Sequence, residues 1–408
     1  MKRSDITYLI YFILVITSCS NLDEEETEDY FNMDFEAMAK HYVPLDTIPL
    51  SDSINYFNYD VNIDRIKENK ITAAQFPNLS VYMLDSLGNV LQKITQAGNA
   101  PGMLGRAQLA STLIDEYGNI FVLTLGNTYR LFMFDKNYNL TKTLNLFKII
   151  EEVTVPPVKD VFKVININNK KIKVVISVLS AVYGMQSVDF FENASGIVEF
   201  TIDLERLEVV DYAKHLPYRN IPDVKVALKD KSIWWRTSNP LLEIHDDKYY
   251  LSYPFTSKVF VYDNNYKLLK NVDINILSNL INYKYIESMG KTAIDFYDRV
   301  ISARRLKYEN INVNHIDIKD NYLLIQFPEV LKENSYSLPT KSEIGVSVGR
   351  ATKVHLNAII KNLETGEEKL ITLPPDFFRI DIIDWDTFYG FHISDEKEFT
   401  ALIKFRYE

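Results

Sequence analysis

Arginine, glutamine and aromatic side chains at scattered positions give this sequence the means to hold a ligand. A guanidinium group can bind a carboxylate or sulfate through two parallel hydrogen bonds, and an aromatic face can stack on a sugar or a side chain. The candidates are Arg106, Gln108, Tyr129, Arg130, Trp234, Trp235, Arg236, Tyr253 and Gln326. Two interpretations stay open. Either they form one ligand site, or the tryptophans pack between structural units while the arginines pair with nearby carboxylates.

Sequence signatures of catalysis and metal binding are missing. The sequence contains no Gly-x-Ser-x-Gly, no His-Glu-x-x-His, no phosphate-binding glycine loop and no cysteine pair. The histidines are far apart in the sequence, so we expect no metal and no other cofactor. A fold that gathers distant residues could still bring His315 and His392 to a common axis as a metal site. Asp381 and Asp384 form the best carboxylate pair, but their spacing also fits the alternation of a strand.

Composition points to a folded, strand-rich protein. The chain has 408 residues, of which 47% are hydrophobic and 13% aromatic, so it can bury a large core. A single cysteine excludes a disulfide framework. The net charge is −10 and no basic stripe is present, so we expect no nucleic-acid partner.

The elements that would position the candidates form a repeat. A strand, a polar turn, a second strand and a third strand ending in Asp or Asn recur along the chain. Asn, Asp and Gly suit these turns because they tolerate the positive φ of tight hairpins. The opening turn of the unit occurs at Lys67–Lys70, Asp115–Asn119, Asn166–Lys170, His245–Lys248, Lys319–Tyr322 and Asp384–Thr387. Six copies predict an all-β fold, a six-bladed β-propeller over residues 41–408.

The last unit is one strand short, because only Glu398–Tyr407 follows its opening turn and second strand. The extended stretch His41–Leu50 could supply the missing strand and close the ring, which would remove two bare sheet edges. Two segments interrupt the repeat. Residues 274–308 form a helical insertion, with Ser288–Leu306 as the helix and its apolar face packed on the ring or, alternatively, on a partner. Residues 328–350 form a long loop.

The propeller prediction places the nine candidate residues together. In propellers, the connections between blades and the turns between second and third strands share one face, where ligands usually bind. The candidates fall at these places, so the sequence predicts an aromatic and guanidinium rim on that face. Arg106 and Gln108, directly after the Gly98–Gly102 loop, are central to this prediction.

The N-terminal residues have the pattern of a targeting segment. Lys2 and Arg3 precede the apolar run Tyr8–Ile16, which is too short to span a bilayer as a helix. Ile16-Thr17-Ser18-Cys19 then resembles the lipobox of bacterial lipoproteins, which implies a signal peptide over residues 1–18, lipidation of Cys19 and a membrane anchor. An ordinary signal peptide with a chance cysteine is the alternative.

Residues 19–40 are expected to form an acidic tether. Ser20–Asp29 is too acidic to form a core. It resembles the export signal that follows the lipidated cysteine in surface-displayed lipoproteins of Bacteroidota. This resemblance implies an outer-membrane protein exposed at the cell surface, whereas a plain spacer would leave the protein facing the periplasm.

The clearest copy of the unit, Val81–Asp135, resembles NHL-type propeller repeats. The matching pieces are Asp85-Ser86-Leu87-Gly88-Asn89, Gly98-Asn99-Ala100-Pro101-Gly102 and Asp115-Glu116-Tyr117-Gly118-Asn119-Ile120-Phe121-Val122. Asn99 and Ala100 interrupt the usual Gly-x-Gly-Pro-Gly loop. With the lipobox and tether, the chain resembles the six-bladed NHL/TolB-like propeller lipoproteins of Bacteroidota, a family of mostly unknown function.

These features together predict a cell-envelope binding protein. The expected role is a non-catalytic propeller that recognises a glycan, a peptide or a partner protein on its rim face. The alternative is a propeller hydrolase or lyase with an axial active site, because some six-bladed propellers are enzymes. Propeller sites are built from distant residues, so the sequence alone leaves both readings open.

Overall fold

The computed structural model describes residues 33–50, 62–67, 70–75, 80–95, 107–115, 117–126, 130–146, 153–154, 162–168, 170–177, 179–180, 195–217, 219, 240–253, 256–281, 301, 305, 309–331, 354–394 and 399–408. Residues from Phe35 to Glu408 form one compact unit. The signal segment, Cys19 and most of the acidic tether lie outside the described residues.

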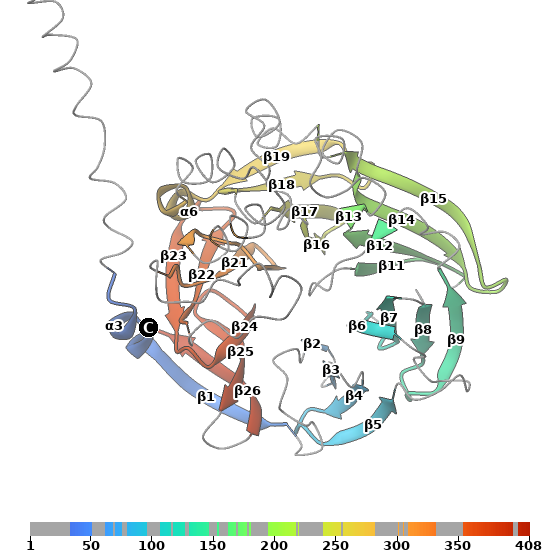
Figure 1. The fold of residues 1–408 in the computed structure, drawn as a ribbon, viewed down its shortest axis with the longest axis horizontal. Helices are drawn as coiled ribbons and strands as arrows, with labels where there is room; N and C mark the ends of the chain where they lie inside the picture. The colour runs from blue at the N-terminus through green and yellow to red at the C-terminus, as the bar shows by residue number, and fades with distance from the viewer. Residues whose placement is uncertain are drawn as a thin grey trace, which may run out of the picture. The chain divides into compact units, whose positions relative to one another are not determined.

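The described strands build an all-β propeller. Figure 1 shows the sheets arranged around a centre, and in the sheets built from four strands in sequence order the first strand is innermost. The first sheet contains β2 (Asn62–Lys67), β3 (Lys70–Gln75), β4 (Ser80–Asp85) and β5 (Val90–Thr95). The second contains β6 (Ala107–Ile114), β7 (Ile120–Gly126), β8 (Arg130–Phe134) and β9 (Leu140–Asn145). The third contains β11 (Phe162–Asn168), β12 (Lys171–Ser177), β14 (Ser195–Asp203) and β15 (Glu208–Pro217).

The second half of the chain continues this pattern. The fourth sheet contains β16 (Leu241–His245), β17 (Lys248–Ser252), β18 (Lys258–Tyr262) and β19 (Leu268–Asp273). The fifth contains β20 (His315–Lys319), β21 (Tyr322–Pro328), β22 (Leu356–Asn362) and β23 (Glu368–Leu373). A separate two-stranded sheet pairs β10 (Val153–Thr154) with β13 (Leu179–Ser180).

Consecutive strands therefore build five blades, one fewer than the six repeats predicted. The sixth repeat supplies only three strands, β24 (Phe377–Ile382), β25 (Thr387–Ser394) and β26 (Phe399–Tyr407). These lie in a composite four-stranded sheet with β1 (Tyr42–Pro49), in the order β1-β26-β25-β24. β1 pairs antiparallel with β26 from Tyr42↔Tyr407 to Pro49↔Ala401. The stretch expected to supply the missing strand is thus β1.

Hydrophobic cores lie between neighbouring sheets. Side chains of a strand alternate between its two faces. On β7, Ile120 and Val122 join a buried cluster with the first sheet, whereas Phe121 and Leu123 join a cluster with the third. Because both faces of a blade are covered, the strands read as continuous apolar runs rather than alternating ones.

Several polar turns share one hydrogen-bonding scheme. The Asp85 side chain accepts bonds from the backbone N–H of Leu87 and Asn89 and from the Asn89 amide. Asp115 makes the same three contacts with Tyr117 and Asn119. The third turn residue after each Asp has positive φ, 83° at Gly88 and 79° at Gly118. The turns are therefore selected for their backbone conformation, as predicted from Asp, Asn and Gly.

Short helices flank the sheets. α3 (Phe35–Met38) and the 3₁₀ turn η1 (Ala39–His41) precede β1. α6 (Asn275–Leu280) follows β19. This six-residue helix precedes the predicted helix Ser288–Leu306, of which only residues 301 and 305 are described, both as helical. The predicted loop 328–350 lies almost wholly outside the described residues. No helix in the described part of the chain is long and apolar enough to cross a membrane.

Candidate functional site

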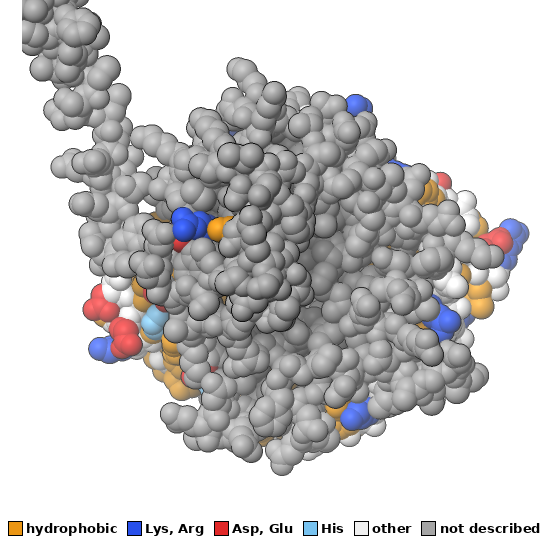
Figure 2. Space-filling view, in the orientation of Figure 1, with side chains coloured by type: hydrophobic (Ala, Val, Ile, Leu, Met, Phe, Trp, Pro, Cys, Tyr) orange, Lys and Arg blue, Asp and Glu red, His pale blue; other side chains and the backbone are white. Residues whose placement is uncertain are grey.

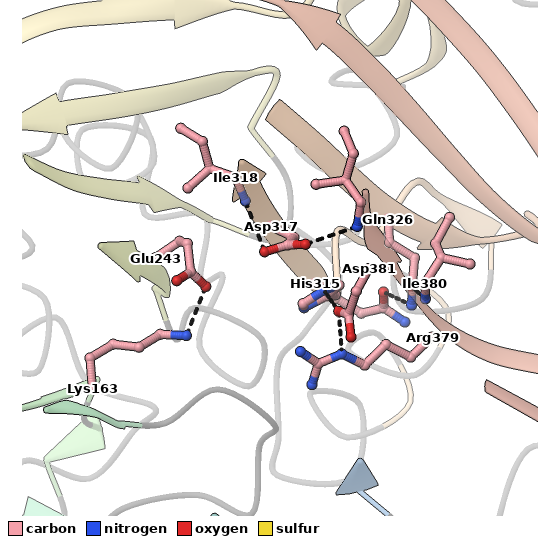
Figure 3. Close-up of polar contacts among 11 residues, drawn as sticks. Lys163, Glu243, His315, Asp317, Ile318, Gln326, Arg379, Ile380 and Asp381 are labelled. Carbon is pink, nitrogen blue, oxygen red and sulfur yellow. Dashed lines mark hydrogen bonds and ion pairs between the residues drawn. The ribbon is translucent and has the colours of Figure 1, made fainter. Parts of the chain in front are cut away.

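Buried and, at Asp381, partly buried ionisable side chains concentrate on the innermost strands of four neighbouring sheets. They project from β11, β16, β20 and β24 and contact one another across the boundaries between sheets (Figure 3). We name this set the inner-strand wall: Lys163, Glu243, His315, Asp317, Arg379 and Asp381. Exposed ion pairs such as Lys170–Glu205 differ from it, because solvent-screened pairs contribute little to stability. In Figure 2 the coloured charged side chains lie mostly toward the edge of the ring.

Lys163 and Glu243 link the third and fourth sheets. The Lys163 Nζ lies 2.7 Å from the Glu243 Oε2, and both side chains are more than nine-tenths buried. The other carboxylate oxygen of Glu243 accepts a 3.3 Å bond from the backbone N–H of Ile244. Burial of either charge alone would be costly, so each makes burial of the other possible.

The fifth sheet and the composite sheet are linked by His315, Asp381 and Arg379. The His315 Nε2 lies 3.2 Å from the Asp381 Oδ1, which also accepts a 2.9 Å bond from the Arg379 Nε. Burial by itself would raise the pKa of Asp381. The Arg379 guanidinium and the His315 ring outweigh it and hold the pKa of that carboxyl well below its usual value. Asp381 is thus an anion at neutral pH.

The same two sheets are also joined through backbone groups of β24. Asp317 accepts 2.9 Å bonds from the backbone N–H of Ile318 and of Ile382. The Gln326 Oε1 accepts a 2.9 Å bond from the Ile380 N–H, and its Nε2 donates to the Asn314 Oδ1 at 3.0 Å. Side chains of β20 and β21 therefore fix the position of β24.

A pocket of about 290 Å³ lies where β6, β11 and β16 reach their hairpin turns. We name it the hairpin-end pocket. Its polar lining includes Lys163 and Glu243, so it borders the inner-strand wall. The full lining consists of Leu113, Ile114, Asp115, Lys163, Val164, Ile165, Asn166, Glu243, Ile244, His245, Asp246 and Asp247.

The predicted rim residues that the structure describes lie at the other ends of the strands. Arg130 begins β8 and is half-buried, and its backbone pairs with Thr124, four residues beyond the start of β7. Tyr253 follows β17 and is 3% exposed, with its ring edge-on to Phe260. Gln326 is 2% exposed and makes the contacts with β24 described above.

The other rim candidates cannot be placed. Gln108 lies in β6, but its side chain is outside the described residues. The remaining candidates lie wholly outside them, namely Arg106, Tyr129, Trp234, Trp235 and Arg236. A ligand-binding role for the rim stays a prediction.

The two histidines considered for an axial metal have different positions. His315 opens the inner strand β20, as predicted, and contacts Asp381. His392 lies on β25, 3.9 Å from Asp376. Among the described residues, no group of three His, Cys, Asp or Glu side chains is placed to hold a metal ion.

Sequence reasoning did not single out Lys163, Glu243 or Arg379. Lys163 and Glu243 are 80 residues apart, and no motif connects them. The sequence does mark two of these positions, because a charged residue interrupts an apolar run in Phe162-Lys163-Val164 and in Leu242-Glu243-Ile244. Such residues are rarely buried without a partner.

Comparison with known proteins shows the fold. No family model matches the sequence, and no curated protein matches it. A DUF4221 family member from Bacteroides vulgatus has a similar structure, with a TM-score of 0.54 at 12% identity, covering 90% of this chain and 97% of that one. This chain folds as a β-propeller. A protein from Bacteroides fragilis described as a candidate exported protein also resembles it, with a TM-score of 0.50 at 8% identity and coverage of 92% and 97%.

Proposed function

We propose that this propeller is a non-catalytic binding module of the cell envelope, which holds a glycan, a peptide or a protein partner. The observation that carries the proposal is the inner-strand wall, in which Lys163–Glu243 and His315–Asp381 join neighbouring sheets and Arg379 pairs with Asp381 within β24. A wall fixed in this way changes little when a ligand arrives, so little ordering free energy is lost on binding. The wall is therefore suited to holding a ligand on a rigid surface rather than to transferring protons.

A propeller hydrolase or lyase is the second candidate, favoured by the His315–Asp381 contact on inner strands. A catalytic histidine must reach the proton that it transfers. The His315 side chain is only 1% exposed, and its Nε2 already contacts Asp381. These facts support a structural link between β20 and β24 over general base catalysis.

The proposal includes a closed ring of six blades, with the composite sheet as the sixth. Three observations support closure. β1 pairs with β26. Tyr82 and Leu84 of the first sheet share a buried cluster with Phe391 and Leu402 of the composite sheet. The turn at Gly88 lies so close to the end of β1 that an added Cβ would overlap the Pro49 carbonyl oxygen.

An engineered disulfide tests the sixth blade. Thr47 and Ile403 are directly opposite in the β1–β26 register. The double substitution Thr47→Cys with Ile403→Cys should form an intramolecular disulfide in residues 19–408 carrying Cys19→Ser, because opposite Cα atoms in antiparallel strands are about 4.5–5.5 Å apart, within the range that a disulfide spans. Thr47→Cys with Thr372→Cys, on another sheet, is the control. Equal crosslinking of both pairs would refute the closure.

The envelope location rests on the lipobox-like Ile16–Cys19 and the acidic Ser20–Asp29 segment. Mass spectrometry of the mature protein should find acyl chains on Cys19. Protease treatment of intact cells should then cleave the protein if it is displayed at the surface and spare it if it faces the periplasm. An unmodified Cys19 in the mature protein would remove the anchor from the proposal.

Binding itself is tested with residues 19–408 carrying Cys19→Ser. Glycan and peptide arrays should yield a ligand that is recovered unchanged after prolonged incubation. Recovery of a cleaved or eliminated product, with its formation abolished by His315→Ala, would instead establish the hydrolase or lyase. Thermal unfolding of His315→Ala must accompany that assay, because the substitution also removes a contact between sheets.

A further inference from the structure

The hairpin-end pocket combines a preformed hollow with an unbalanced charge. Among the described residues, four carboxylates line it, those of Asp115, Glu243, Asp246 and Asp247, against one ammonium, that of Lys163. Its volume is about 290 Å³. Three sheets contribute to it, so its shape does not depend on one loop.

Two of the carboxylates are engaged within the fold. Glu243 is buried against Lys163. Asp115 accepts bonds from Tyr117 and Asn119 and a 3.3 Å bond from the Asn166 amide. Both groups are therefore held in fixed positions, and the Lys163–Glu243 pair adds no net charge, so the excess negative charge of the pocket comes from Asp115, Asp246 and Asp247.

The other two carboxylates are at its mouth. Asp246 and Asp247 are the two central residues of the β16–β17 hairpin turn, with φ of 48° and 57°. The side chain of Asp246 is 75% exposed, and its Oδ2 lies 3.5 Å from the His245 Nε2. Half-buried apolar side chains of Val164, Ile165 and Ile244 lie beside these charges.

We infer that this pocket takes the ammonium or guanidinium group of a lysine or arginine side chain on a peptide partner. The inference rests on the binding role proposed above and gives that role a ligand class. Excess negative charge repels anions and attracts cations, and the apolar side chains suit the methylene stem of a basic residue. A basic side chain can donate to several carboxylates without the closed geometry that a metal ion needs.

Short peptides test the inference on residues 19–408 carrying Cys19→Ser. Acetylated, amidated Gly-Lys-Gly and Gly-Arg-Gly should bind in ligand-observed NMR titrations, and the Gly-Gln-Gly and Gly-Glu-Gly analogues should not. Affinity should fall as NaCl rises from about 50 to about 500 mM, because exposed charges are screened. Equal binding of the lysine and glutamine peptides, or no binding of either basic peptide, would overturn the inference.

Substitutions locate the site. Asp246→Asn with Asp247→Asn should weaken binding of the basic peptides by about threefold to tenfold, since each exposed charge pair contributes modestly. Asn tolerates positive φ, so the turn should persist. Asp320→Asn is the matched control, because Asp320 also has positive φ, 52°, in the β20–β21 turn outside the pocket. Equal weakening by the control would overturn the assignment.

The array and the peptide titration separate the two proposals. An array ligand without a basic group, bound equally by the wild type and by the Asp246→Asn, Asp247→Asn variant, would keep the binding role and overturn the cationic ligand. A ligand converted to product would overturn the non-catalytic role, whatever the peptide result.

Discussion

Lys163 on β11 and Glu243 on β16 form a 2.7 Å ion pair that lies almost wholly out of solvent between two neighbouring sheets. Glu243→Gln should destabilise the protein by about 3–5 kcal/mol, because it leaves a buried ammonium without its counter-charge. The double substitution Lys163→Met with Glu243→Leu should recover much of that loss. Urea unfolding of the single and double variants measures the coupling, and strictly additive losses would contradict it.

Gly88 and Gly366 allow a matched test of the contact between the first sheet and β1. Both have positive φ, 83° and 78°, but an added Cβ meets the Pro49 carbonyl oxygen only at Gly88 and nothing within 4 Å at Gly366. Gly366→Ala should lose about 1–2 kcal/mol from its backbone conformation alone. Gly88→Ala should lose about 1–3 kcal/mol more from steric overlap. Equal losses in urea unfolding would argue against the close approach.

Asp381 should support stability only while it is ionised. Its pKa is depressed in the folded protein, so the stabilisation is complete above the unfolded pKa of about 3.9 and is lost as the pH falls through the lower folded pKa. Asp381→Asn should therefore be less stable than wild type at pH 7, and the difference should shrink below about pH 4. Free energies of unfolding in urea at pH 7, 5 and 3 check this. A constant difference would mean that the carboxylate charge plays no part.

His215 should make the protein sensitive to mild acid. Its ring stacks on the ring of Tyr266, with the two centroids 3.8 Å apart. Burial lowers the pKa of His215; the carboxylates of Glu199 and Asp211 oppose this shift, and the ammonium of Lys173 adds to it. The unfolded state binds a proton more readily, so stability falls as the pH drops below about 6.5. His215→Gln should flatten that dependence between pH 7.5 and 5. The measurement is urea unfolding across this range, and an unchanged slope would exclude His215 as its source.

Glu368 should stabilise the exit from the fourth sheet. Its two carboxylate oxygens accept 2.9 Å bonds from the backbone N–H of Asn275 and Ile276, in the first turn of α6, and one oxygen also lies 2.6 Å from the Lys361 Nζ. Glu368→Ala should lose about 1–3 kcal/mol, because polar partners in a partly buried position are left unsatisfied. Glu364→Ala, on an exposed turn of the same sheet, is the control. Equal losses in urea unfolding would show that capping of α6 contributes nothing.

Local features of the fold could be predicted because neighbours in the sequence determine them. The Asp85–Asn89 and Asp115–Asn119 turns are such cases, since one aspartate bonds to backbone groups two and four residues ahead. β1 could be predicted by counting strands, as the last repeat lacked one. The pairing of His315 with Asp381 could not, although each residue had been noted, because it depends on the register of two strands 66 residues apart.

The candidate site was harder to predict for the same reason. Reasoning from propeller geometry directed attention to the strand ends near Tyr253 and Gln326, where both side chains are buried. The hairpin-end pocket lies at the opposite ends, and its aspartates had been explained as turn residues. That explanation is correct for Asp115, whose carboxylate is engaged by its own turn. It does not account for the pocket that the turns of three adjacent sheets enclose together.

β1, the first of the described strands in the sequence, pairs with β26, the last of them. The Tyr407 hydroxyl donates to the Met38 carbonyl oxygen across 369 residues of sequence, and the Glu408 N–H donates to the His41 carbonyl oxygen. While the chain is being synthesised, β1 has no partner strand until β26 has been made. Without β26, the backbone groups of β1 and β25 that pair with it are left open, and such open edges favour aggregation. The position of β1 therefore depends on a strand from the opposite end of the described propeller.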